Sequence, residues 1–203
     1  MEDDDSFFKL INTGTIDPFI SLWGTKQTAY LKNKYLYPVA NKNEFKQAFP
    51  RRHSQCTSKK LIITGMRYLE CFYDDLGKYI AGKSTLIIRD LDNDDLFAVF
   101  CCLLNSKLVS FYIKESFSTL GIDGGVNFSK DMINDIPLPE VNSRLTVALN
   151  TLFKKLLLTP DNVAIKNQLD SLIYKHYKLE FEEVIKIEPS FQLAKNEYNS
   201  IEI

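Results

Sequence analysis

The chain has 203 residues, 45% of them hydrophobic and 25% charged, which is the composition of a folded globular protein and not of a disordered segment. No apolar run reaches the roughly 18 residues needed to span a bilayer, and residues 2–5 are acidic, unlike a secretory signal. The net charge of −1 conceals an asymmetry, since residues 26–60 hold nine basic side chains and one acidic side chain.

The N-terminal part of the chain is expected to be irregular. Residues 7–19 are predicted to be extended or turn-rich, because a glycine and an Asp-Pro pair interrupt any helix there. Residues 25–37 contain three side chains at helical spacing, which predicts a short helix. The polar and basic stretch 41–60 contains Pro50 and predicts a long loop, a kind of segment that is usually functional or mobile.

The centre of the chain predicts a sheet followed by a buried helix. Residues 61–64, 68–73 and 85–88 are rich in β-branched and aromatic side chains, which is typical of strands. A helix over 95–105 follows, because Asp and Asn residues just before it can cap its first turn. Its apolar run is expected to lie in the core. The polar group Asn105-Ser-Lys107 is expected to make structural hydrogen bonds.

Helical patterns dominate the rest of the chain. The sequence predicts helices over residues 108–117, 129–133, 142–158, 161–177 and 181–187, with a turn over 121–125. The expected fold class is α+β, with a small mixed or antiparallel sheet, packed helices and a helical C-terminal part. We expect an α+β domain over 1–140, a helical segment over 141–190 that packs on it, and a flexible tail over 191–203.

The four cysteines indicate neither disulfides nor a metal site. Cys101 and Cys102 are adjacent within the apolar run and are expected to be small core residues. His53 and Cys56 have a ligand-like spacing, but a tetrahedral zinc site needs four ligands and no second pair follows. We therefore expect a surface loop at that position. This cysteine usage is typical of a reducing environment and favours a cytoplasmic location.

Sequence motifs for catalysis are absent. The chain has no P-loop, no Gly-x-Gly-x-x-Gly fingerprint and no Gly-x-Ser-x-Gly elbow. It also lacks a Pro-Pro pair, which the Asn/Asp-Pro-Pro-aromatic motif of amino-methyltransferases contains. Asp17 with Glu44 and Lys46 matches a short metal-nuclease pattern of an acidic residue followed by Glu-x-Lys. Because that pair falls in a predicted basic loop, we expect it to be solvated, and we expect no catalytic residue and no metal ligand.

Four groups of residues occur in an order that is typical of one family. They are Ile11–Phe19 with Leu22-Trp-Gly24; Lys60–Arg67 with Asp74, Gly77 and Lys83-Ser-Thr85; Leu103-Leu-Asn-Ser-Lys-Leu108 through Phe111-Tyr112 with Gly124-Gly125, Phe128-Ser-Lys130 and Ile136-Pro-Leu-Pro139; and Leu169–Tyr174 with Leu179 and Glu182-Glu183. In this order they resemble the C-terminal target-recognition (specificity) domain of TaqI-like and type IIG restriction-modification DNA methyltransferases. The methyltransferase core that precedes this domain in the family is absent from this sequence, so we expect a fragment, a truncated product or a free-standing module.

The resemblance implies function by binding. The chain would bind double-stranded DNA sequence-specifically and position it for a separate methyltransferase core domain or subunit, which flips out the target base. S-adenosylmethionine and magnesium would belong to those catalytic domains, so no cofactor is expected here. Basic side chains would attract phosphates, and polar side chains would contact base edges. The expected DNA-binding residues are Lys34, Lys42, Lys46, Arg51, Arg52, Gln55, Lys59, Lys60 and Arg67.

Two other classes of function remain open from the sequence. One is a metal-dependent restriction nuclease fragment that uses Asp17, Glu44 and Lys46. The other is a protein-interaction scaffold that derives from a target-recognition domain and no longer binds DNA.

Overall fold

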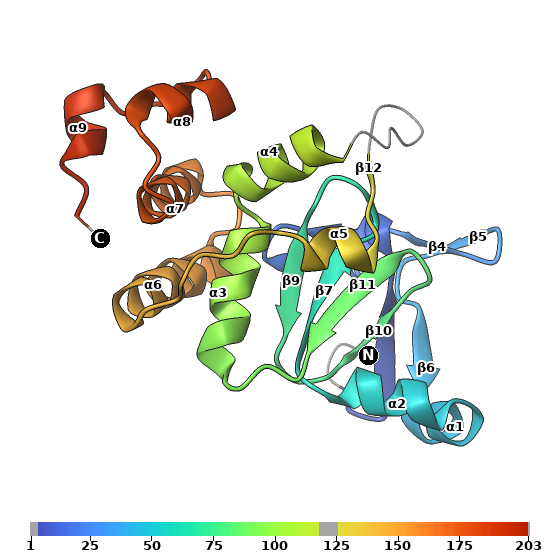
Figure 1. The fold of residues 1–203 in the computed structure, drawn as a ribbon. Coiled ribbons are helices and arrows are strands. Elements are labelled where there is room, and N and C mark those ends of the chain that lie inside the picture. Colours follow the sequence, from blue (N-terminus) through green and yellow to red (C-terminus); the bar gives the residue numbers. More distant parts are fainter. Residues whose placement is uncertain (1–3, 118–125, 203) are drawn as a thin grey trace.

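The central sheet has β7 (Lys60–Thr64) between two antiparallel neighbours, β9 (Cys71–Asp74) and β11 (Thr85–Arg89) (Figure 1). The computed structural model describes residues 4–117 and 126–202. All five residues of β7 are buried. The strands predicted at 61–64 and 85–88 are confirmed, and the one predicted at 68–73 begins only at Cys71. The small sheets with packed helices confirm the α+β class.

Smaller sheets surround the central one. The strand β1 (Phe7–Ile11) pairs in parallel with β10 (Tyr79–Ala81) and antiparallel with β6 (Val39–Asn41). Three two-stranded ribbons complete the strands: β2 (Ile16–Asp17) with β3 (Ile20–Ser21), β4 (Thr28–Tyr30) with β5 (Asn33–Tyr35), and β8 (Met66–Arg67) with β12 (Val126–Asn127). A single 3-10 turn, η1 (Thr13–Thr15), precedes β2.

The helices expected after residue 94 are confirmed, with ends that differ by a few residues. They are α3 (Asp94–Leu104), α4 (Lys107–Ser116), α5 (Lys130–Asn134), α6 (Ser143–Leu158), α7 (Val163–His176) and α8 (Phe181–Ile187). Five of them begin at an Asn or Ser whose side chain accepts a backbone N–H: Asn93, Ser106, Ser129, Asn142 and Asn162. In the described ranges no single helix is long and apolar enough to cross a bilayer, although α3 and α4 meet that test together across a 60° bend.

The main core lies between the central sheet and the helices on one side of it. Side chains alternate along β7, so Leu61 and Ile63 join the core formed with α3, α4, α6 and α7. Ile62 points the other way and packs with Ile11 and Trp23. Because β7 is covered on both faces, its sequence is a continuous apolar run rather than an alternating one. Cys101 and Cys102 are fully buried in the main core, as expected.

The polar group after α3 joins the sheet to the helices, which confirms the structural role expected for it. The amide of Asn105 accepts from the backbone N–H of Cys71 at 2.9 Å and donates to the carbonyl of Cys71 at 2.8 Å. Ser106 is the N-cap of α4. The backbone N–H of Lys107 donates to Asp170 at 2.9 Å, which ties the start of α4 to α7. These bonds explain why polar residues stand between two apolar helices.

Three expectations for the first 60 residues are wrong. Residues 25–37 form the β4–β5 hairpin instead of a helix, and the predicted loop 41–60 forms α1 (Lys42–Ala48), α2 (Pro50–Thr57) and the start of β7. His53 and Cys56 therefore lie on a helix and not in a surface loop.

The C-terminal segment also differs from the loose tail that we expected over 191–203. It contains the short helix α9 (Lys195–Asn199), on which Tyr198 is fully buried. The ring of Tyr198 packs with Phe181, Phe191 and other apolar side chains around α8. The turn predicted at 121–125, including Gly124-Gly125, lies outside the described residues.

Candidate nucleic-acid interface

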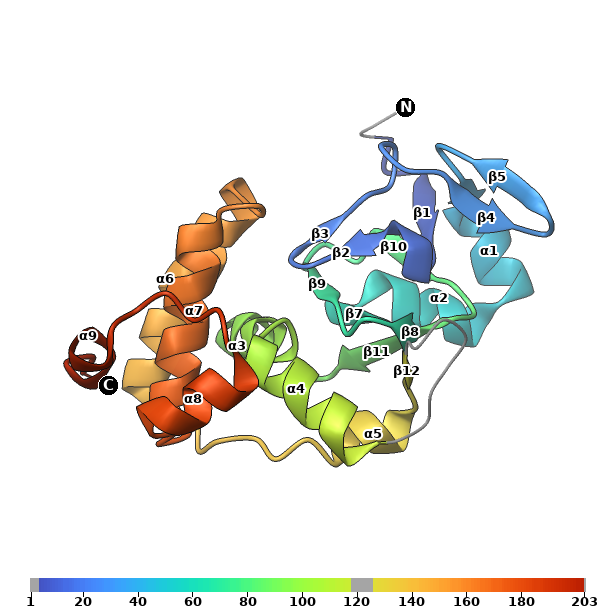
Figure 2. The same cartoon turned by 90° about the horizontal axis from the view of Figure 1, so that it is seen from above.

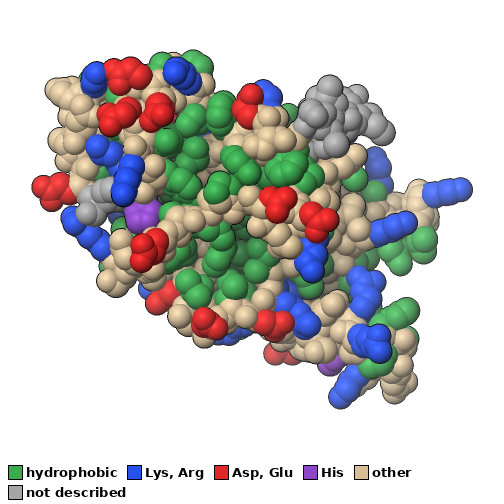
Figure 3. Space-filling view, in the orientation of Figure 1, with side chains coloured by type: hydrophobic (Ala, Val, Ile, Leu, Met, Phe, Trp, Pro, Cys, Tyr) green, Lys and Arg blue, Asp and Glu red, His purple; other side chains and the backbone are tan. Residues whose placement is uncertain are grey.

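Five of the exposed basic residues of segment 26–60 are carried by three elements at one end of the molecule. Lys32 and Lys34 lie on the β4–β5 hairpin, Lys46 on α1, and Arg51 and Arg52 on α2. Figure 2 shows this end opposite α6–α9. Figure 3 shows lysine and arginine side chains gathered over the same end. We call these five side chains the basic face.

Local sequence explains why α1 and α2 form on this face. The Asn41 side chain accepts the backbone N–H groups of Asn43 and Glu44 and so caps α1. Pro50 occupies the first turn of α2, where its missing N–H costs nothing and its fixed φ favours a helix. On α2 the apolar side is small, with only Cys56 buried, so Arg51 and Arg52 stay in solvent. The guanidinium of Arg52 donates to the carbonyl of Ala81 at 2.9 Å, which orients this side chain along the end of β10.

Lys60 does not belong to the interface, which corrects its assignment as a DNA contact. Its side chain is 1% exposed, and its Nζ lies 2.5 Å from Asp74 Oδ2. The same ammonium donates to the carbonyls of Cys56 at 2.7 Å and Ser58 at 3.2 Å. Asp74 also accepts the backbone N–H groups of Lys78 and Tyr79. The pair is therefore a buried structural connection between β7, β9 and β10.

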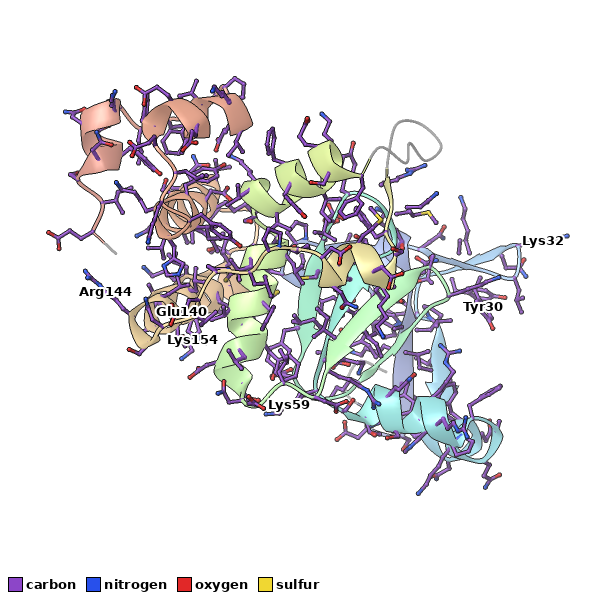
Figure 4. All side chains as sticks on the ribbon, in the orientation of Figure 1. Tyr30, Lys32, Lys59, Glu140, Arg144 and Lys154 are labelled. Carbon is purple, nitrogen blue, oxygen red and sulfur yellow. The ribbon has the colours of Figure 1, made fainter. Side chains whose placement is uncertain are left out.

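Three further predicted residues have partners within the fold. Lys59 lies beside α3, with its Nζ 2.5 Å from Asp94 and nearly half of its side chain exposed. Lys42 is half-buried, with its Nζ 5.2 Å from the centre of the Phe8 ring. Arg67 lies on β8 in the left-handed region, with φ of 73°. Figure 4 shows Lys59 near the start of α3, apart from the hairpin that carries Lys32.

Two hollows with mixed polar and apolar linings adjoin the basic face. The first, the α2 hollow, has a volume of about 400 Å³, and its polar lining includes Arg52, Gln55, Thr85, Lys130 and Asn134. The second, the hairpin hollow, has a volume of about 550 Å³ at the foot of β4, and its polar lining includes Asn12, Asp17, Lys26, Gln27, Arg67, Tyr68 and Glu70. The 82–85 turn separates them, because Ser84 lines the hairpin hollow whereas Gly82 and Thr85 line the α2 hollow. Lys83 lies on this turn and is exposed.

Glu70 is the titratable group of the hairpin hollow with a displaced pKa. Burial raises the pKa of its carboxyl to about 7, and the nearby negative charge of Asp17 contributes to the rise. The positive charges of Lys26 and Lys166 oppose it. The lining of this hollow includes both hydrogen-bond donors, such as Lys26 and Arg67, and acceptors, such as Asp17 and Glu70.

Sequence reasoning found Arg67 but missed Glu70, Lys83 and most of the hairpin hollow. One signal for Glu70 was present: it is an acidic residue inside an apolar stretch, Leu69-Glu-Cys-Phe72, that continues into a strand. Lys83 belongs to one of the groups that carry the family resemblance, but only the fold places its turn between two hollows.

The residues of the nuclease alternative lie on separate elements. Asp17 is on β2, whereas Glu44 and Lys46 are on the exposed helix α1 and not on a buried strand. Over residues 4–117 and 126–202, no group of three or more His, Cys, Asp and Glu side chains is arranged to hold a metal ion. This placement does not favour the nuclease alternative over the others.

Comparison with known proteins adds no family assignment. No protein-family model matches the chain, and no curated protein matches it.

Proposed function

We propose that this chain is the DNA target-recognition domain of a type II, IIG-like restriction-modification methyltransferase. It binds duplex DNA sequence-specifically and presents it to a separate methyltransferase core domain or subunit. The core supplies S-adenosylmethionine chemistry and any magnesium-dependent step, and this chain supplies the binding surface. A cytoplasmic location follows from that role.

One observation carries the proposal: the basic face adjoins two hollows that contain polar side chains. Lysine and arginine side chains attract the phosphate backbone without regard to sequence. Polar side chains in the hollows, such as Gln55 and Gln27, offer the donors and acceptors that read base edges. The two functions are thus adjacent on one end of the molecule, as a duplex requires. The family resemblance supports the same role.

The proposal is tested by the salt dependence of DNA binding. Affinity of the full chain for a labelled 30-bp duplex pool is measured by fluorescence anisotropy at several salt concentrations. Removing one basic side chain that neutralises a phosphate flattens the log–log slope by about 0.9, so Arg51→Ala with Arg52→Ala should weaken binding and reduce the slope by up to roughly two.

A matched control is available on α6. Lys154 and Lys155 are exposed on the helical part, so their double alanine variant changes the net charge equally but should leave the slope unchanged. Figure 4 shows Lys154 well away from the hairpin. Equal weakening in both variants would place the footprint elsewhere. A parent chain that binds no duplex even at low salt would end the DNA proposal.

A further inference from the structure

The β4–β5 hairpin has a turn that its sequence does not favour. Tyr30 pairs with Asn33, so Leu31 and Lys32 alone form the turn. Both have positive φ, 47° and 66°, as in the type I′ turn that suits a twisted hairpin. This conformation favours Asn and Gly, and a branched side chain such as leucine is rarely found in it. Such an outlier at an exposed tip is a reason to look for a function there.

The side chains at the tip are exposed, and two of them are apolar or aromatic. Leu31 is 76% exposed and Tyr30 is 50% exposed. The hairpin projects from the body of the molecule (Figure 1), and Figure 4 places Tyr30 and Lys32 at its outer end. Packing within the chain therefore does not explain a leucine at this position, whereas contact with a partner would.

The foot of the hairpin is held firmly, so the position of its tip is defined. The amide of Asn12 donates to the carbonyl of Ala29 at 2.9 Å. Trp23 donates to the carbonyl of Pro38 at 2.9 Å, and its ring meets that of Tyr37 edge-on at 5.2 Å. Ala29 itself lines the hairpin hollow. The hairpin is thus a fixed projection from the edge of that hollow.

Charge indicates what the hairpin meets. Between Asp17 and Glu44 the chain has no acidic residue, while it has lysines at 26, 32, 34 and 42. A polyanion therefore complements the hairpin, which carries Lys32 and Lys34 and has Lys26 just before it. A two-stranded ribbon also fits the major groove of B-form DNA, which is about 12 Å wide.

We infer that the β4–β5 hairpin enters the major groove of the bound duplex, where Leu31 contacts thymine methyl groups and Lys32 contacts guanine acceptors. This inference rests on the proposed function and names the element that reads sequence. The other four side chains of the basic face position the duplex through its phosphates, and the tip discriminates between base pairs.

The test exchanges the tip for the turn that the backbone favours. In Leu31→Asn with Lys32→Gly the hairpin keeps its conformation with less strain, so thermal stability should be equal or higher. A binding site is first selected from a random duplex pool with the full parent chain. The ratio of the variant's affinities for the selected and a scrambled duplex should be roughly tenfold smaller than that of the parent. The variant should still bind both duplexes in a salt-dependent way.

Two further measurements sharpen the test. Leu158→Asn alters a leucine that is 85% exposed at the end of α6, and it should leave the preference unchanged. Replacing the thymines of the selected site by uracil removes only the methyl groups, and it should weaken binding of the parent chain more than that of the tip variant.

The outcomes separate the two proposals. If the parent binds and discriminates but the tip variant discriminates equally well, the hairpin inference is overturned and the DNA-binding proposal stands. A parent that binds without any preference, or whose binding is insensitive to uracil, also overturns the inference. If the parent binds no duplex at all, both fail together.

Discussion

Lys59 and Lys60 are neighbours in the sequence and opposites in the fold. The Lys59 side chain is 48% exposed and pairs with an Asp94 side chain that is 64% exposed, whereas Lys60 and Asp74 are 1% and 2% exposed. The Nζ–carboxylate distance is 2.5 Å in both pairs. The same contact distance therefore occurs in two very different solvent environments. The difference teaches that a basic segment can contain buried structural charges beneath exposed ones, and that counting charges does not separate the two.

Strand geometry accounts for the difference between the two lysines. Lys60 is the first residue of β7, and the register places it directly opposite Asp74 on β9. Successive side chains point to opposite sides of an extended chain, so Lys59 turns outward to α3. One consequence is that stability should depend on the buried lysine and DNA binding on the exposed basic side chains.

The largest effect is expected from Lys60→Ala. This change leaves the Asp74 carboxylate buried without its cation, which should lower the free energy of unfolding by about 3–5 kcal/mol. Urea denaturation measures it. In Lys60→Met with Asp74→Asn the buried charge is removed on both sides. The amide oxygen can replace only one of the two carboxylate oxygens that accept from Lys78 and Tyr79, so part of the stability should be recovered. If Lys60→Ala lowered the free energy of unfolding by less than about 1 kcal/mol, the structural role assigned to the buried Lys60–Asp74 pair would be contradicted.

Glu70 lies between the two extremes and should show an intermediate, pH-dependent effect. Its pKa in the folded state, about 7, is above the ordinary value of 4.5, so folding favours the protonated carboxyl. The contribution to stability is complete below pH 4.5 and disappears as the pH rises through 7. Glu70→Gln should therefore raise the melting temperature at pH 8 and change it little at pH 4.5.

Thermal melts at the two pH values check this prediction. At pH 8 the melting temperature should rise by roughly 2–4 °C for each kcal/mol by which the substitution raises the free energy of unfolding. Part of the pH dependence should persist, because burial also raises the pKa of Asp170 to about 6. Glu115→Gln, an exposed position on α4, is the control and should change neither melt. A Glu70→Gln variant that is no more stable at pH 8 would mean that this carboxyl is well solvated.

The helical part of the fold was predictable from local signals. Asn and Ser caps precede α3 to α7, and apolar side chains recur along α6 and α7 at helical spacing. The strand β7 was predictable as well, since Leu61-Ile-Ile-Thr64 is short, apolar and β-branched. In these elements local preference and tertiary packing agree, so one chain suffices to find them.

The candidate site was less predictable because its elements lack the usual signals. Leu31-Lys32 is not the Asn-Gly of a type I′ turn, so local sequence does not indicate the hairpin. Pro50 resembles a helix breaker in the sequence, although it stands at a helix start. The inward direction of Lys60 depends on its register with Asp74, and the hairpin hollow brings together residues from 12 to 84. Such contacts between distant segments are set by the fold and not by local sequence.

The smallest effect is expected from Lys59→Ala, and it completes the comparison with Lys60. An exposed ion pair gains little, because water and salt screen it and two long side chains lose freedom. The Lys59 ammonium does lower the pKa of Asp94, but Asp94 also stands in the first turn of α3, where the helix dipole stabilises its negative charge without a partner. The melting temperature should therefore fall by no more than about 3 °C.

Salt distinguishes this small effect from a structural one. In 1 M salt the Debye length is about 3 Å, so the difference in melting temperature between the parent and Lys59→Ala should shrink, while that for Lys60→Ala should persist. In the DNA titration the slope should fall by at most roughly one, because Lys59 must leave Asp94 to reach a phosphate. If Lys59→Ala proved as destabilising as Lys60→Ala at every salt concentration, solvent exposure would not explain how much each lysine contributes to stability. The distinction between a buried structural lysine and an exposed one would then be wrong.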